Sequence, residues 1–323
     1  MEAQRTDPGE WSWFEGQFAD IRTNIERVIQ GKSHEIRLTL VALIAEGHLL
    51  IEDVPGVGKT MLAKAMARSV DCSFRRIQFT PDLLPTDITG VNVYNQERGD
   101  FEFKPGAIFA NIVLGDEINR ASPKTQSALL ESMEERQVTV DAVSYQLGVP
   151  FMVVATQNPI EHEGTYPLPE AQLDRFMMRL VIGYPEPEAE AEILATHGTQ
   201  STLEDIGPVT DASGAARMIG VARGVYVAES LRRYIVDIAE ATRRHPDVYL
   251  GASPRAAIML LRATRALAAS DGRDYAIPDD IKSLAVPVLA HRLIVSADAA
   301  MSGRNAETVL ADTLAEVPVP VTG

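Results

Sequence analysis

The sequence predicts an α/β protein in which a three-layer core around a parallel sheet is followed by a small all-helical domain. Up to residue 184, short apolar runs that suit buried strands alternate with segments whose apolar residues recur at helical spacing. The paired prolines of Tyr184-Pro185-Glu186-Pro187 resist both helix and sheet and so indicate a boundary. Beyond them the apolar residues show only helical spacing, which predicts a helical second domain.

The N-terminal part precedes the first strand of the predicted sheet. Residues 1–16 are expected to be flexible, with the aromatic residues Trp11, Trp13 and Phe14 beginning to pack onto the folded part. Helical spacing then predicts a helix that ends at Gly31 and a second that starts at Ser33, a suitable N-cap. The apolar run over 48–51 predicts the first buried strand.

The remaining core elements follow in order over residues 17–184, the predicted core. A helix is predicted over 60–70, one helical turn near 81–84 and a helix over 123–134, with strands at 74–79, 112–114, 151–155 and 178–182. Alternating segments on either side of 96–100 and of Asp141-Ala142 predict two hairpins inserted into the core. Residues 185–316 form the predicted helical lid, and residues 317–323 a loose tail.

Composition limits the classes of function. The 323 residues are 46% hydrophobic, which is enough for packed domains. A net charge of −15 disfavours sequence-independent binding to nucleic acid, which needs a positive field. The single cysteine, Cys72, excludes an internal disulfide, and no apolar run is long enough for a membrane span. The N-terminus lacks a secretory signal, so we expect a cytoplasmic protein.

The loop after the first strand carries the strongest motif. It reads Asp53-Val54-Pro55-Gly56-Val57-Gly58-Lys59-Thr60 and continues into Met61. A glycine-containing loop that starts a helix with Lys-Thr presents backbone N–H groups and a fixed cation to a phosphate group. Asp53 stands where the usual pattern has glycine, but that position lies furthest from the phosphates. We therefore interpret residues 53–61 as a nucleotide-binding loop; the alternative is a chance Gly-Lys-Thr in a surface turn.

Two carboxylates, Asp116 and Glu117, follow the apolar strand that starts at Ile112. This pair suits phosphate hydrolysis, because one acid can hold magnesium while the next polarises a water molecule. We assign the metal to Asp116 and the water to Glu117. The alternative, that the pair only caps the next helix, does not explain the apolar strand before it.

Three further residues could complete such a site. Asn158 follows a predicted strand and could orient the attacking water, or it could only form an Asn-Pro turn. Arg175 ends a short predicted helix and could stabilise a transferring phosphoryl group from a neighbouring subunit. Arg255 lies in the first turn of a helix capped by Ser253, where an anion must compensate it. The alternatives are surface ion pairs, of Arg175 with Asp174 or Glu170, and of Arg255 with Asp279 or Asp280.

The order of these motifs resembles that of AAA+ ATPases, and within them the MoxR family. The residues that carry the resemblance are 52–60, Asp116-Glu117-Ile118-Asn119-Arg120-Ala121, Ala155-Thr156-Gln157-Asn158-Pro159 and 163–176, which ends in Leu173-Asp174-Arg175-Phe176. The resemblance extends over most of the chain, from about residue 36 to about residue 292.

The resemblance implies an ATP- and Mg²⁺-dependent ATPase that forms a ring, expected to be a hexamer. Thr60 and Asp116 would hold magnesium, with Asp116 and Glu117 as the Walker B pair. Asn158 would be sensor 1, Arg175 an arginine finger acting on the next subunit and Arg255 sensor 2. Both hairpins would face a central pore. Members of the family resemble chaperone-like motors whose protein partners often carry a von Willebrand factor A domain.

The sequence leaves three alternative functions open. A nucleic-acid motor could use the hairpins to grip DNA, although the acidic balance counts against it. The motor subunit of a metal chelatase would have a similar fold. A nucleotide-gated scaffold would bind ATP with little turnover, against which Glu117 and Arg175 argue.

Overall fold

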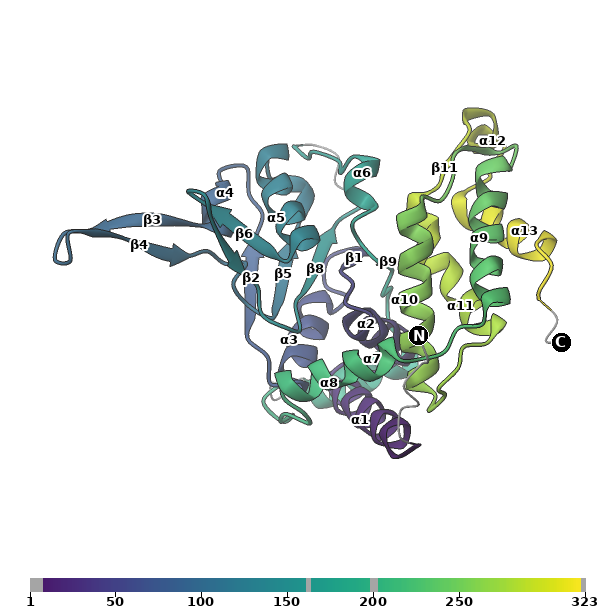
Figure 1. Ribbon diagram of the computed structural model, residues 1–323, viewed down its shortest axis with the longest axis horizontal. Coiled ribbons are helices and arrows are strands. Elements are labelled where there is room, and N and C mark those ends of the chain that lie inside the picture. Colours follow the sequence, from purple (N-terminus) through teal and green to yellow (C-terminus); the bar gives the residue numbers. More distant parts are fainter. Residues whose placement is uncertain (1–7, 161–163, 198–202, 321–323) are drawn as a thin grey trace.

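The computed structural model describes residues 8–160, 164–197 and 203–320 (Figure 1). Its centre is a five-stranded sheet in the order β2-β5-β8-β1-β9, and each neighbouring pair is parallel. The strands are β1 (Leu49–Glu52), β2 (Phe74–Gln78), β5 (Ile112–Asp116), β8 (Met152–Gln157) and β9 (Met178–Leu180). The predicted parallel α/β core is therefore confirmed.

Helices cover both faces of this sheet, because alternate strand residues point to opposite sides. Leu49 and Ile51 belong to the cluster shared with α1 (Pro8–Glu26), α2 (Ser33–Ile44) and α3 (Lys59–Ser69). Leu50 belongs to the opposite cluster, shared with α4 (Pro85–Thr89) and α5 (Pro123–Glu135). This alternation produces the predicted three layers.

The first helix begins earlier than predicted. Helix α1 starts at Pro8, and Trp11 and Phe14 are buried within it. The expectation that residues 1–16 are flexible is therefore wrong for residues 8–16, while residues 1–7 lie outside the described part. The physical reason is that Trp11 and Phe14 continue the apolar face of Phe18 and Ile21 at the same helical spacing.

Both predicted hairpins are present. Strands β3 (Gly90–Asn95) and β4 (Asp100–Pro105) pair antiparallel and project from the body of the molecule (Figure 1). Strands β6 (Gln137–Val140) and β7 (Val143–Gln146) form the second hairpin. The Phe103 and Tyr145 rings stack with centroids 4.0 Å apart, which joins the two hairpins. The turn expected at 81–84 is present as a single hydrogen-bonded turn, in which Leu83 N donates to Thr80 O at 3.1 Å, and is not helical. Helix α4 begins at Pro85, a residue suited to the first helical position.

In the described ranges beyond residue 185 the chain is mainly helical, as predicted, and also contains a short strand pairing. The longer helices of this part are α7 (Pro187–His197), α8 (Ala212–Arg223), α9 (Glu229–Arg244), α10 (Pro254–Ser270), α11 (Pro278–Leu289) and α13 (Ala306–Glu316), with the short α12 (Ala297–Met301) between the last two. The strand pairing is antiparallel and joins β10 (Val248–Leu250) to β11 (Ile294–Val295). These strands are too short to show a period-two pattern, which is why the sequence did not reveal them. None of the helices in the described ranges is long and apolar enough to cross a membrane.

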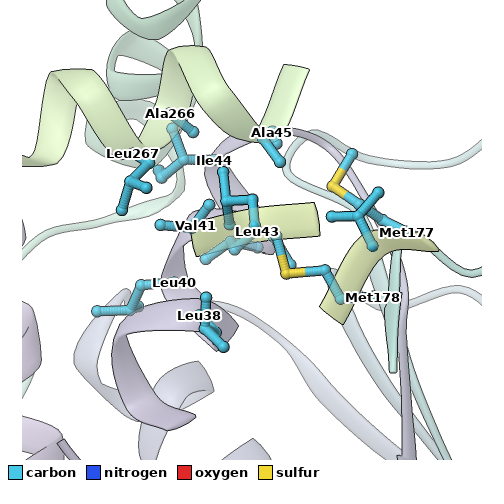
Figure 2. Packing of buried hydrophobic residues seen from close by; sticks show 14 of the residues in the cluster. Leu38, Leu40, Val41, Leu43, Ile44, Ala45, Met177, Met178, Ala266 and Leu267 are labelled. Atoms are coloured by element: carbon cyan, nitrogen blue, oxygen red, sulfur yellow. The ribbon is translucent and has the colours of Figure 1, made fainter. Parts of the chain in front are cut away.

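Helix α2 joins the lid to the core. Figure 2 shows side chains of α2, among them Ile44, gathered with Ala266 and Leu267 of α10 and with Met177 and Met178 at the start of β9. All of these side chains are at most 7% exposed. Core and lid therefore share one hydrophobic cluster, through which the C-terminal half of α10 packs on α2.

Candidate nucleotide-binding site

The predicted nucleotide-binding loop runs from the end of β1 to the start of α3. Gly58 is the N-cap of α3 with φ +93°, a left-handed conformation that side chains disfavour. Asp53 is buried, and its carboxylate accepts hydrogen bonds from Val54 N at 2.8 Å and from Gly183 N at 2.6 Å. Asp53 therefore ties the base of the loop to the segment that leads into the lid, which accounts for aspartate at this position.

A cleft of about 340 Å³ brings most of the predicted site residues together. It is lined by Pro55, Gly56, Gly58, Lys59, Thr60, Met61, Asp116, Glu117, Thr156 and Asn158. Lys59 Nζ donates to the carbonyl oxygens of Asp53, at 2.6 Å, and Val54, at 3.2 Å. Burial lowers the pKa of Lys59, and the nearby carboxylates of Asp53, Asp116 and Glu117 oppose that shift. The cleft thus places one cation beside two carboxylates.

A network that the sequence did not reveal holds the two carboxylates. Thr156 Oγ1 donates to Asp116 Oδ1 at 2.6 Å and accepts from Glu117 N at 3.0 Å. Arg76 on the neighbouring strand β2 donates to Asp116 Oδ2, with Nε at 3.1 Å, and Gln78 Nε2 donates to Glu117 Oε2 at 2.8 Å. The sequence offered one signal for these two residues: Arg76 and Gln78 are two apart on a predicted strand, so their side chains share one face of the sheet. The pairing of Gln78 with Asp116 is known only from the structure.

Glu117 has an unusual backbone. Its φ of +57° is left-handed, a strained conformation for a residue with a long side chain. Its side chain also pairs with Arg120, with 3.2 Å between Nε and Oε2. Strain of this kind persists only where the surroundings enforce it, and here the bond to Thr156 and the end of β5 do so.

The residues of the cleft fit a nucleotide with its magnesium ion. The Thr60 hydroxyl and the Asp116 carboxylate are hard oxygen ligands, which Mg²⁺ prefers, and both line the cleft. The Lys59 ammonium and the loop amides at the start of α3 suit phosphate oxygens. Thr60 and Asp116 would therefore hold Mg²⁺, and the metal would supply positive charge to the phosphates.

A second cavity, of about 420 Å³, adjoins the loop. Loop residues Pro55, Gly56, Val57, Gly58 and Met61 line one side, and Val28, Ile29, Tyr184 and Leu194 line the others. Tyr184 and Leu194 are 73% and 74% exposed, so large apolar surface borders the cavity. A flat base attached to phosphates in the first cleft would fit here. Sequence reasoning missed these outer residues, because no motif contains them.

Asn158 lies where both interpretations made from the sequence place it, and its role toward the attacking water stays a prediction. It lines the cleft, and its Oδ1 accepts from Ile160 N at 3.1 Å, as an Asn-Pro turn requires. The side chain is 8% exposed at the end of β8.

The two predicted arginines lie together but outside the residues that line the cleft. Arg175 NH2 lies 3.1 Å from Glu134 Oε2, and Arg255 NH1 lies 2.7 Å from Glu134 Oε1. The ion pairs proposed as alternatives are wrong in their partners: Asp174 pairs with Arg292, and Asp280 pairs with Arg273. Glu134 lies at the end of α5, and only the tertiary fold brings it to both arginines. Ser253 is the N-cap of α10, as predicted.

Comparison with known proteins agrees with this geometry. The family described as "ATPase family associated with various cellular activities (AAA)" matches residues 48–178, and the AAA lid domain matches residues 240–313. The protein YeaC of Bacillus subtilis is 50% identical over 298 residues, which cover 92% of this chain and 93% of that protein. Chaperone MoxR1 of Mycobacterium tuberculosis is 42% identical over 321 residues, which cover 95% of this chain and 85% of that protein.

A solved structure supports the same assignment. The crystal structure of a protein from Cytophaga hutchinsonii superposes with a TM-score of 0.91 at 38% identity, covering 97% of this chain and 98% of that one. The fold, the nucleotide cleft and the similarity over nearly the whole length agree. The chain belongs to the MoxR family of AAA+ ATPases.

Proposed function

We propose that the protein assembles into a ring, a hexamer, and uses ATP with Mg²⁺ to remodel, activate or mature a protein client in the cytoplasm. The similarity of the chain to the protein named Chaperone MoxR1 supports the proposal of a protein client. We further propose that the client is reached through a partner with a von Willebrand factor A domain, as the family resemblance implies.

Each residue of the cleft has a role in this proposal. Lys59 and the backbone N–H groups of the loop 53–61, in which Pro55 has none, bind the phosphates, and Thr60 with Asp116 holds Mg²⁺. Bound Mg²⁺ would neutralise phosphate charge. Glu117, oriented by Gln78, accepts a proton from the attacking water, and Asn158 positions that water. The cavity beside Ile29 and Tyr184 takes the adenine base.

The observation that carries the ring proposal is the place of the two arginines. Phosphoryl transfer needs cations on the transferring group, and the described cleft contains Lys59 but neither Arg175 nor Arg255. Both arginines instead meet Glu134, where each side chain remains about one third exposed, at 28% and 34%. We infer that they serve the nucleotide of a neighbouring subunit.

The projecting hairpin supports a protein client over a nucleic acid. Its exposed apolar side chains include Val91, Val93, Tyr94 and Phe101, which are 43–67% exposed. Lys104 is paired with Glu102 at 3.2 Å, so its positive charge is partly neutralised. Apolar surface of this kind suits contact with a polypeptide, whereas a DNA grip needs a positive field.

Mixing two inactive variants tests the shared site. Arg175→Ala subunits keep their own cleft, and Glu117→Gln subunits keep their arginine. We expect mixed rings to recover part of the hydrolysis that each variant lacks alone. Where the cleft of an Arg175→Ala subunit faces a Glu117→Gln subunit, that interface has both an intact Glu117 and an intact Arg175. Co-purification of the two variants through an affinity tag on only one of them must show that mixed rings form. No recovery at any ratio, although mixed rings are present, would mean that Arg175 acts within its own subunit.

A further inference from the structure

A buried side chain of the lid, Arg292, contacts the segment that carries Arg175. This residue lies in the 3-10 turn Ala290–Arg292 after α11, and its side chain is only 2% exposed. Its Nε is 2.7 Å from Asp174 Oδ1, and its guanidinium also donates to the carbonyl oxygens of Asp174, at 3.2 Å, and Met177, at 3.3 Å. The lid thus binds the backbone on both sides of Arg175.

A second lid element holds the same carboxylate. Ser253, the N-cap of α10, accepts a hydrogen bond from Ala256 N at 3.1 Å, and its hydroxyl donates to Asp174 at 3.1 Å and 3.3 Å from the two carboxylate oxygens. Asp174 is therefore held by two separate parts of the lid. It directly precedes Arg175 in the chain.

These contacts help to fix the position of the Arg175 side chain. Short helix α6 (Glu170–Leu173) ends just before Asp174, its C-cap. Arg175 lies in the turn that follows, where its N–H donates to Gln172 O at 3.1 Å, and the lid contacts of Asp174 add to this local bond. A group that acts on a transferring phosphoryl must be placed closely, since an error of about 1 Å can lower the rate by about 100-fold. Charge-assisted bonds, such as that between Asp174 and Arg292, are directional and suit this task.

We propose that Asp174, held by Arg292 and Ser253 of the lid, is a positioning residue that directs Arg175 toward the nucleotide of the neighbouring subunit. The proposal rests on the role proposed above for Arg175. A change in lid orientation in one subunit then alters hydrolysis in the next, because both lid elements hold the Asp174 carboxylate and Arg292 also holds the carbonyl oxygens of Asp174 and Met177 on either side of Arg175.

The test uses a substitution that keeps the helix cap. In Ser253→Asp, aspartate caps a helix as well as serine does, but its charge repels Asp174. We expect the kcat for ATP to fall about 10- to 100-fold with the KM for ATP within about two-fold, because the cleft is unchanged. The matched control is Ser296→Asp, the same change at the N-cap of α12, where we expect parent kinetics. Ser253→Thr keeps the hydroxyl and should restore the rate.

The decisive measurement repeats Ser253→Asp in an Arg175→Ala background. If Asp174 acts through Arg175, the second substitution lowers the residual rate no further. An equal further loss, as expected for a general structural defect or an effect through Arg255, would overturn the proposal. If Ser253→Asp does not fold, Arg292→Lys, which keeps the charge but loses the forked contacts, is measured in the same two backgrounds.

Two outcomes separate this inference from the proposed function. If Arg175→Ala lowers kcat but Ser253→Asp does not, Asp174 is not a positioning residue and the shared site still stands. If Arg175→Ala keeps the parent kcat, the proposed role of Arg175 fails and this inference fails with it.

Discussion

Replacing Thr156 by valine should weaken both the fold and the hydrolysis of ATP. Thr156 is 1% exposed, and its hydroxyl bonds to Asp116 and to the backbone N–H of Glu117. Valine keeps the shape but removes both bonds. A hydrogen bond to a charged group contributes about 1.5–3 kcal/mol and a neutral one about 0.5–1.5 kcal/mol. Because Asp116 also keeps its bond to Arg76, we expect a loss of about 2–3 kcal/mol in the free energy of unfolding.

Urea unfolding followed by circular dichroism measures this loss, provided that the m-value is unchanged. We also expect kcat to fall about 10-fold or more, which corresponds to about 1.4 kcal/mol of barrier, because the Glu117 backbone loses a bond that holds its left-handed conformation. Thr156→Ser keeps the hydroxyl and is the control. A Thr156→Val protein with the stability and the kcat of the parent would refute the reasoning.

Three further predictions follow from the site and the core. Glu117→Gln should bind ATP as the parent does but lose most turnover, and steady-state hydrolysis within about two-fold of the parent would reject its role. Lys59→Ala should instead weaken nucleotide binding, which a titration with labelled ATP would detect. Burial lowers the pKa of His48 from 6.5 to about 4, so the unfolded state binds more protons between these pH values. Stability should therefore fall as the pH drops through this range, by up to about 1.4 kcal/mol per pH unit for this group. Burial lowers the pKa of His291 as well, so His48 accounts for only part of the effect. In His48→Gln, the difference between the free energies of unfolding at pH 7.5 and pH 5.5, measured with urea, should be smaller than in the parent but not zero. If that difference equals the parent's, the assignment to His48 is contradicted.

The sequence predicted the elements of the core because their signals are local. The strand, loop and helix from residue 49 to residue 69 and the cap at Ser253 depend on residues that are close together in the chain. The same local reasoning failed at α1, where the polar residues that open the chain obscured the apolar face of Trp11 and Phe14. It also missed β10 and β11, which are too short to carry a period.

The sequence by itself determined the fold class, the two hairpins and most of the residues that line the nucleotide cleft, Thr156 being the exception. Each motif joins the end of a strand to the start of a helix or turn. Only the tertiary structure decided which charges meet. Glu134 is 121 positions from Arg255, and Arg292 is 118 positions from Asp174, yet each pair is in contact. A charged side chain leaves no periodic pattern that names its partner, because its pairing depends on how the lid packs on the core through a shared apolar cluster.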